Sequence, residues 1–120
     1  MASIYRILIK THHMTSRKKI ITITKAAKRL SCSVILKTGG PPGVMVAEGE
    51  GALDWMEIVR NLRYKDYQLM KKEEVDRARM SIPQGEVQEV TSVKQLGALL
   101  SRDEDLYKWW RVNMGYSKDE

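Results

Sequence analysis

The chain has no phenylalanine and very little cysteine or proline, with one Cys and three Pro in 120 residues. The single cysteine, Cys32, cannot form a disulfide within the chain, which indicates a reducing intracellular compartment. No apolar run approaches the roughly 20 residues that a membrane span needs, so we expect a soluble protein with no membrane partner. Hydrophobic residues make up 42% of the chain and charged residues 30%, as in ordinary globular domains. This length predicts a single domain around one core.

Acidic residues are missing from the first 47 positions, and Glu48 is the first carboxylate of the chain. The rest of the sequence is nearly balanced in charge. Such a separation is expected of a protein that meets a polyanion with one surface, although a basic face without any partner remains an alternative. The cations of this first segment are Arg6, Lys10, Arg17, Lys18, Lys19, Lys25, Lys28, Arg29 and Lys37.

Two periodicities mark the first elements of the chain. Residues 3–10 alternate between two faces, one of them strongly apolar, and this pattern predicts a strand. After the turn KTHHMTSRKK, Thr15 and Ser16 are natural helix caps, and a helix is predicted over residues 16–30 although ITIT is rich in β-branched residues. Apolar residues recur there at helical spacing, at Ile20, Ile23, Ala27 and Leu30.

The following segments complete a known order of elements. Residues 32–38 and 43–49 are apolar runs separated by GGPPG, which predicts a β-hairpin. Residues 52–62 have helical spacing, and residues 65–75 fit a half-exposed strand. The order β-α-β-β-α-β predicts an α+β, ferredoxin-like two-layer sandwich, in which two helices cover one face of a four-stranded antiparallel sheet.

The other face of this sheet is either open to a ligand or covered by the rest of the chain. We predict a core over residues 1–76 and an extension over residues 77–116 that packs on it within one domain. The extension should contain a short strand and one or two helices, followed by a disordered tail at 117–120. Its apolar content favours docking on the sheet, with Trp109 and Trp110 in the core.

The chain resembles the C-terminal domain of the pre-mRNA-processing factor three family, which also follows the RWD domain in some RWD-domain-containing proteins. The resemblance covers nearly the whole chain, is strongest over residues 8–49 and is loose from residue 76 onward. The resemblance lies in a strand ending in His-His, a basic helix start, and the hairpin GPPGVMVAEG, where Pro42 replaces the more usual lysine. It implies a ferredoxin-like fold with a C-terminal extension and a nuclear location. It also implies binding to spliceosomal RNA, or protein interaction as in the RWD-linked members.

The predicted phosphate-binding surface joins the His-His turn to the basic side of the first helix. Lys18, Lys25 and Arg29 share the helix face opposite the apolar stripe, and no acid in the helix pairs with them. A solvated face with no partner is the alternative. The residues predicted to contact RNA are Lys10, His12, His13, Arg17, Lys18, Lys19, Lys25, Arg29 and Lys37.

Other chemistry has weaker support in the sequence. Adjacent histidines on an extended backbone point to opposite sides, so no metal site is predicted, and neither a cofactor nor a small-molecule substrate is expected. An acylphosphatase-like enzyme is a minor alternative, because Asn61 falls in a helix and the turn lacks phosphate-cradling glycines. The sequence therefore predicts a non-catalytic RNA-binding module, with protein interaction as the alternative. Few bases could stack, since only Tyr5, Tyr64 and Tyr67 are candidates.

Overall fold

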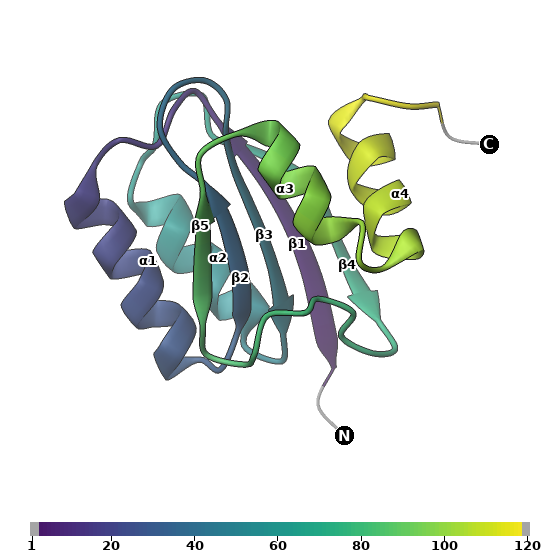
Figure 1. Ribbon diagram of the computed structural model, residues 1–120. Helices are drawn as coiled ribbons and strands as arrows, with labels where there is room; N and C mark the ends of the chain where they lie inside the picture. Colours follow the sequence, from purple (N-terminus) through teal and green to yellow (C-terminus); the bar gives the residue numbers. More distant parts are fainter. Residues whose placement is uncertain (1–2, 119–120) are drawn as a thin grey trace.

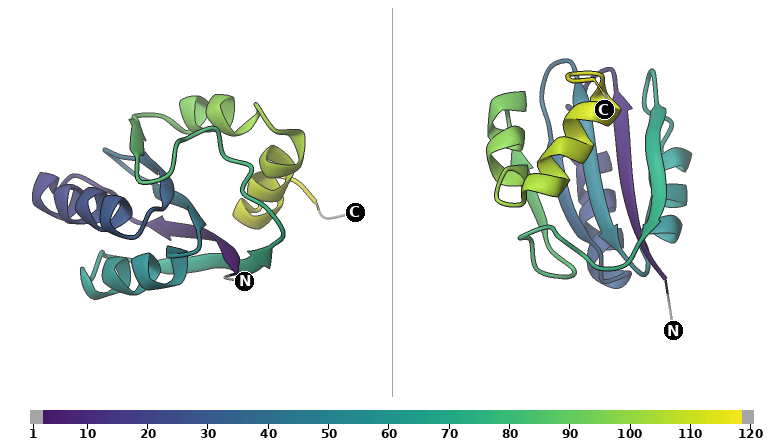
Figure 2. Two further views of the ribbon diagram at one scale, coloured as in Figure 1. Left: turned by 90° about the horizontal axis from the view of Figure 1, so that it is seen from below. Right: turned by 90° about the vertical axis from the view of Figure 1, so that its right-hand side faces the viewer.

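The computed structural model describes residues 3–118, which form a five-stranded sheet with two helices on each face (Figures 1 and 2). The strand order is β4-β1-β3-β2-β5, and only β5 runs parallel to its neighbour, β2. The predicted ferredoxin-like fold with its C-terminal extension is confirmed. The elements are β1 (Ile4–Thr11), α1 (Arg17–Arg29), β2 (Ser33–Lys37), β3 (Gly43–Gly49), α2 (Ala52–Asn61), β4 (Gln68–Val75), β5 (Val87–Val90), α3 (Val93–Leu100) and α4 (Glu104–Met114).

Helix α1 forms because its cap and its apolar stripe outweigh the β-branched composition of ITIT. The side chain of Ser16 accepts a hydrogen bond from the Lys19 amide at 3.2 Å, which satisfies a free N–H of the first turn. Ile20 and Ile23 then pack fully buried against the sheet in the core shared with α2. Tertiary packing decides the conformation of this segment.

Helices α3 and α4 cover the second face of the sheet, as the left view of Figure 2 shows. Leu8 and Val46 from the sheet form a second core there with the helices. Asp103 begins α4 by accepting from the Leu106 amide at 2.9 Å. The partners from the helices are Leu96, Leu100, Leu106 and Trp110.

The core and extension boundary at residue 76 stays a prediction, as does the disordered tail at 117–120, of which residues 119 and 120 lie outside the described part. No helix within residues 3–118 is long and apolar enough to cross a membrane.

A buried carboxylate ties the long β4–β5 connection to the sheet. Glu48 in β3 accepts from Arg6 Nε in β1 at 2.7 Å. It also accepts from the backbone amides of Arg79 at 2.9 Å and Met80 at 2.7 Å. The Arg6 guanidinium lies over the Trp109 ring, with 5.4 Å between Cζ and the ring centroid, so this ion pair also contacts α4.

Candidate functional site

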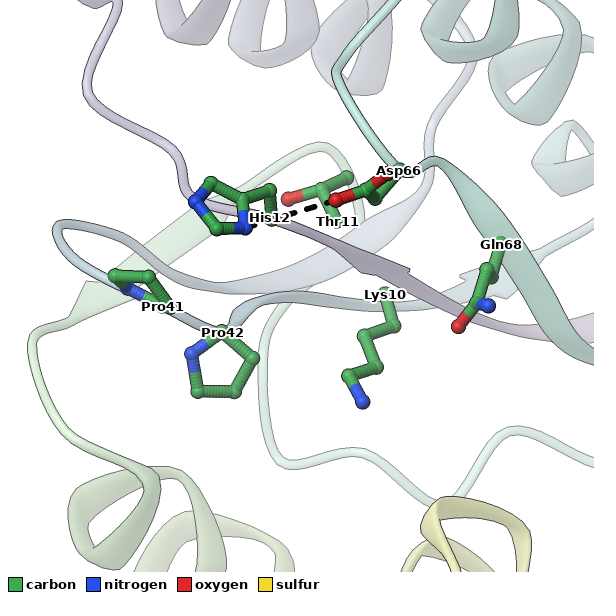
Figure 3. A pocket seen from close by; sticks show the side chains of 7 residues that line it. All are labelled: Lys10, Thr11, His12, Pro41, Pro42, Asp66 and Gln68. Carbon is green, nitrogen blue, oxygen red and sulfur yellow. Dashed lines mark ion pairs between the residues drawn. The ribbon is translucent and has the colours of Figure 1, made fainter.

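A pocket of about 460 Å³ opens where β1 ends, and we call it the strand-end pocket (Figure 3). One wall comes from the last residues of β1 and the residue after it, a second from the β2–β3 turn, and a third from the segment that enters β4. These three segments are far apart in sequence and meet through the pairing of β1 with β3 and with β4. The lining residues are Lys10, Thr11, His12, Pro41, Pro42, Asp66 and Gln68.

Backbone hydrogen bonds hold the walls of this pocket. The His12 amide donates to the Lys65 carbonyl at 2.9 Å, which fixes the end of β1 against the α2–β4 connection. Met14 and Gly39 exchange two bonds of 3.0 and 2.8 Å, which fix the β2–β3 turn. Lys37 Nζ donates to the Gly40 carbonyl at 2.7 Å. The pocket is therefore shaped before any ligand arrives.

The pocket carries charges of both signs. Asp66 Oδ2 lies 3.6 Å from His12 Nδ1, and both side chains are substantially exposed. Lys10 is partly buried and has no ion-pair partner among residues 3–118. Lys10 and Asp66 therefore line one pocket without neutralising each other.

The sequence predicted that the two histidines point to opposite sides, and this prediction is wrong. Their ring centroids lie 5.1 Å apart, because β1 ends at Thr11 and strand alternation no longer applies to the next two residues. His12 lines the pocket, whereas His13 is exposed and outside the lining. Within residues 3–118, no group of three or more His, Cys, Asp or Glu side chains could hold a metal ion.

The predicted phosphate-binding residues do not form one surface. Arg17 makes a two-bond ion pair with Glu89 of β5, at 2.7 and 2.9 Å, which raises the pKa of Arg17 and lowers that of Glu89. Lys19 lies over the Tyr64 ring, 4.8 Å from its centroid. Lys37 is buried, and this burial lowers its pKa. These three cations are therefore already engaged within the fold.

Three predicted cations remain free on α1. Lys18, Lys25 and Arg29 are exposed, and none has an ion-pair partner in the described part of the chain. We call these three residues the α1 cationic face. They span about 16 Å along the helix at 1.5 Å per residue. The predicted cationic ridge is thus present on α1 and separate from the strand-end pocket.

The tyrosines proposed for base stacking pack into the fold. Tyr64 is 8% exposed, and burial raises its pKa to about 12. Tyr5 and Tyr67 pack against the same core as partly buried side chains. Tyr64 is therefore closed to a stacking base, and Tyr5 and Tyr67 offer only part of their rings.

Asp66, Gln68 and the two prolines are pocket residues that sequence reasoning missed. Asp66 stands just before β4, and Gln68 pairs directly with Lys10 in the register. Pairing β4 with β1 in the predicted sheet would have placed Asp66 and Gln68 near the His-His turn. The only signal in the sequence was an Asp at the entrance of an edge strand.

Two solved structures share this fold across nearly the whole chain. One is BlrB, a BLUF protein in its dark state, which is 22% identical with a TM-score of 0.57 over 91% of this chain and 85% of its own. Another is a bacterial light-regulated adenylyl cyclase, which is 14% identical with a TM-score of 0.55 over 92% of this chain and 38% of its own. No protein-family profile and no curated protein matches the chain.

These neighbours contradict the family resemblance drawn from the sequence, because they are BLUF and light-regulated proteins and not pre-mRNA-processing or RWD-linked ones. The predicted RNA-binding function is therefore wrong, and its RWD-type and acylphosphatase-like alternatives gain no support from these neighbours. The predicted nuclear location was implied by the same resemblance, so these neighbours give it no support. The error has a physical source, since a strand, a basic helix start and a Pro-Gly hairpin are what this fold requires locally and do not specify one family. The neighbours themselves establish the fold.

Proposed function

We propose that the chain is a non-catalytic regulatory module that docks onto an acidic surface of an effector protein through the α1 cationic face. The observation that carries this proposal is the set of three exposed cations without partners within residues 3–118. Surface cations aligned over about 16 Å attract a complementary acidic surface and orient its approach. The basic helix gives the module its preference for acidic partners.

The proposal of a protein partner is supported by one structural neighbour, in which this fold is part of a larger protein. The light-regulated adenylyl cyclase matches over only 38% of its own length, so the fold occurs there as part of a larger regulated enzyme. Of the two predicted partners, protein and RNA, this comparison supports protein. The module proposed here likewise acts on an effector and has no chemistry of its own.

A flavin chromophore does not fit between the layers of this chain. A flavin needs a slot for its planar rings, but Trp55 of α2 fills the seam with α1, and its Nε1 donates to the Ile23 carbonyl at 3.3 Å. Trp55, Ile23 and Val59 have no exposed surface, so the two helices would have to part before a ring could enter. The opposite face of the sheet is closed by buried Leu96 and Leu100. No light-driven step is assigned to this chain.

The strand-end pocket likewise offers no activated nucleophile. His12 and Asp66 form a His–carboxylate pair, but the hydroxyl beside them, Thr11 Oγ1, donates to the His13 carbonyl at 3.2 Å and belongs to a residue that is 1% exposed. A nucleophilic site needs an accessible hydroxyl or thiol within reach of its base. This arrangement favours binding over catalysis.

The test uses poly-L-glutamate as an acidic protein probe in calorimetric titrations. A triple variant, Lys18→Glu, Lys25→Glu and Arg29→Glu, removes the α1 cationic face. The matched control reverses three exposed lysines elsewhere, Lys71, Lys72 and Lys108, and changes the net charge by the same amount.

We expect the α1 variant to lose at least about tenfold in affinity, since each exposed ion pair contributes roughly 0.5 kcal/mol and tenfold equals about 1.4 kcal/mol. The control should lose much less. Equal losses in both variants would show that only net charge matters and would refute docking through α1.

A further inference from the structure

We infer that the strand-end pocket binds a small zwitterion that carries both a carboxylate and an ammonium group, as a free amino acid does. This inference is independent of docking through α1, because the pocket and the α1 cationic face have no residue in common. It rests on the two opposite charges that line the pocket, on its fixed walls, and on its size.

The charges suit a ligand that bears both signs. In Figure 3, Lys10 and Asp66 lie on opposite sides of the β1 ribbon, and the one ion pair drawn joins Asp66 to His12. The Lys10 ammonium would receive the carboxylate of the ligand, and the Gln68 amide beside it in β4 offers a further donor. The Asp66 carboxylate would receive the ammonium. The Lys10 ammonium then gains the partner that it lacks within residues 3–118, and the Asp66 carboxylate gains a second partner beside His12.

Single-charge ligands suit the pocket less well. A simple anion on Lys10 would approach the Asp66 carboxylate, and a simple cation on Asp66 would approach the Lys10 ammonium. A metal ion has only one carboxylate and one imidazole in the lining. The mixed charge therefore discriminates in favour of zwitterions.

The walls set the size of the ligand. A volume of about 460 Å³ admits a small metabolite and lies at the lower end of the range for drug-sized sites. Pro41 and Pro42 give one side an apolar surface, against which the side chain of an amino acid could pack. The backbone bonds of His12 and Met14 hold these walls in place, so little ordering accompanies binding.

The experiment follows the backbone amides of the isotope-labelled full chain by NMR during titration with each of the twenty standard free amino acids. Acetate and methylammonium serve as the single-charge probes. Three variants are compared with the wild-type chain: Lys10→Met and Asp66→Asn in the pocket, and Lys65→Met as the control, since Lys65 is exposed and outside the lining.

We expect at least one amino acid to shift the amides of His12 and Gln68 saturably, while acetate and methylammonium at equal concentration do not. Lys10→Met and Asp66→Asn should each weaken binding by about threefold to fivefold, and Lys65→Met should leave it nearly unchanged. Retained dispersion of the spectrum shows that each variant folds.

Three results would overturn the inference: no amino acid binds at millimolar concentration, acetate binds as tightly as any amino acid, or the pocket variants bind like the wild type. The triple variant of the α1 cationic face should keep its amino acid binding. Failure of the docking proposal and failure of the pocket proposal are therefore distinguishable.

Discussion

Replacing Glu48 by Gln should destabilise the chain strongly although the two side chains have nearly the same shape. One carboxylate oxygen, Oε2, accepts from Arg6 Nε at 2.7 Å. The other, Oε1, accepts from the amides of Arg79 and Met80 at 2.9 and 2.7 Å. A glutamine has only one acceptor oxygen, so either Arg6 or the two amides must face an NH₂ group.

The magnitude follows from the burial of the ion pair. The Glu48 side chain has no exposed surface and that of Arg6 is 7% exposed, so water cannot replace the lost partner. Removing one partner of a buried ion pair costs about 3–5 kcal/mol. That is a large share of the roughly 5–15 kcal/mol that stabilises a typical domain. The melting temperature should fall by roughly 10–20 °C.

Urea unfolding measured by circular dichroism checks this value. The control is Glu57→Gln, because Glu57 pairs with Arg60 at 2.7 Å on the exposed side of α2, where a pair contributes only about 0.5 kcal/mol. Amide hydrogen exchange should also speed up in residues 76–86, which Glu48 anchors. If Glu48→Gln cost no more than Glu57→Gln, Glu48 would not be the anchor of this connection.

Two further predictions concern close packing and pH. Gly43→Ala should lower the free energy of unfolding, measured in urea, by about 1–3 kcal/mol, because a Cβ there would collide with Thr11 Oγ1 and Met14 Cγ. The control Gly40→Ala should change this free energy little, because no atom lies within 4 Å of a Cβ at that position. Equal effects of the two substitutions would contradict the close packing at Gly43. Burial raises the pKa of Tyr64 to about 12 from an ordinary 10, so its contribution to stability should be complete below about pH 10 and be lost as the pH rises to about 12. An ultraviolet titration of the folded chain that showed Tyr64 ionising near pH 10 would contradict this shift.

Periodicity, together with helix caps and the turn GGPPG, was enough to predict the fold. Alternation in β1 and helical spacing in α1 report which face of each element is buried, and burial is what decides these conformations. The question of the second sheet face was settled by α3 and α4, whose leucines and Trp110 needed a partner and found it on the sheet. Local composition favoured a strand in ITIT, but the cap at Ser16 and the helical spacing still predicted the helix that forms.

The site could be predicted only in part, because its pairings are long-range. The ion pair of Arg17 with Glu89 could not be predicted from the sequence near Arg17, because Glu89 lies 72 residues further along the chain. The pair forms only when β5 joins the sheet beside β2. Lys37 was predicted to be a free cation, but the structure shows that it is buried and that its Nζ donates to the Gly40 carbonyl. Lys18, Lys25 and Arg29 were predictable, since a helix face depends only on local spacing.

The most direct test of the docking proposal follows the backbone amides of the labelled chain by NMR during titration with poly-L-glutamate, at low salt and at about 200 mM salt. Docking through α1 predicts saturable shifts concentrated in Arg17–Arg29 that shrink as salt rises. Shifts that were spread evenly over the surface, with Lys71, Lys72 and Lys108 responding as strongly as Lys18, Lys25 and Arg29, would contradict it.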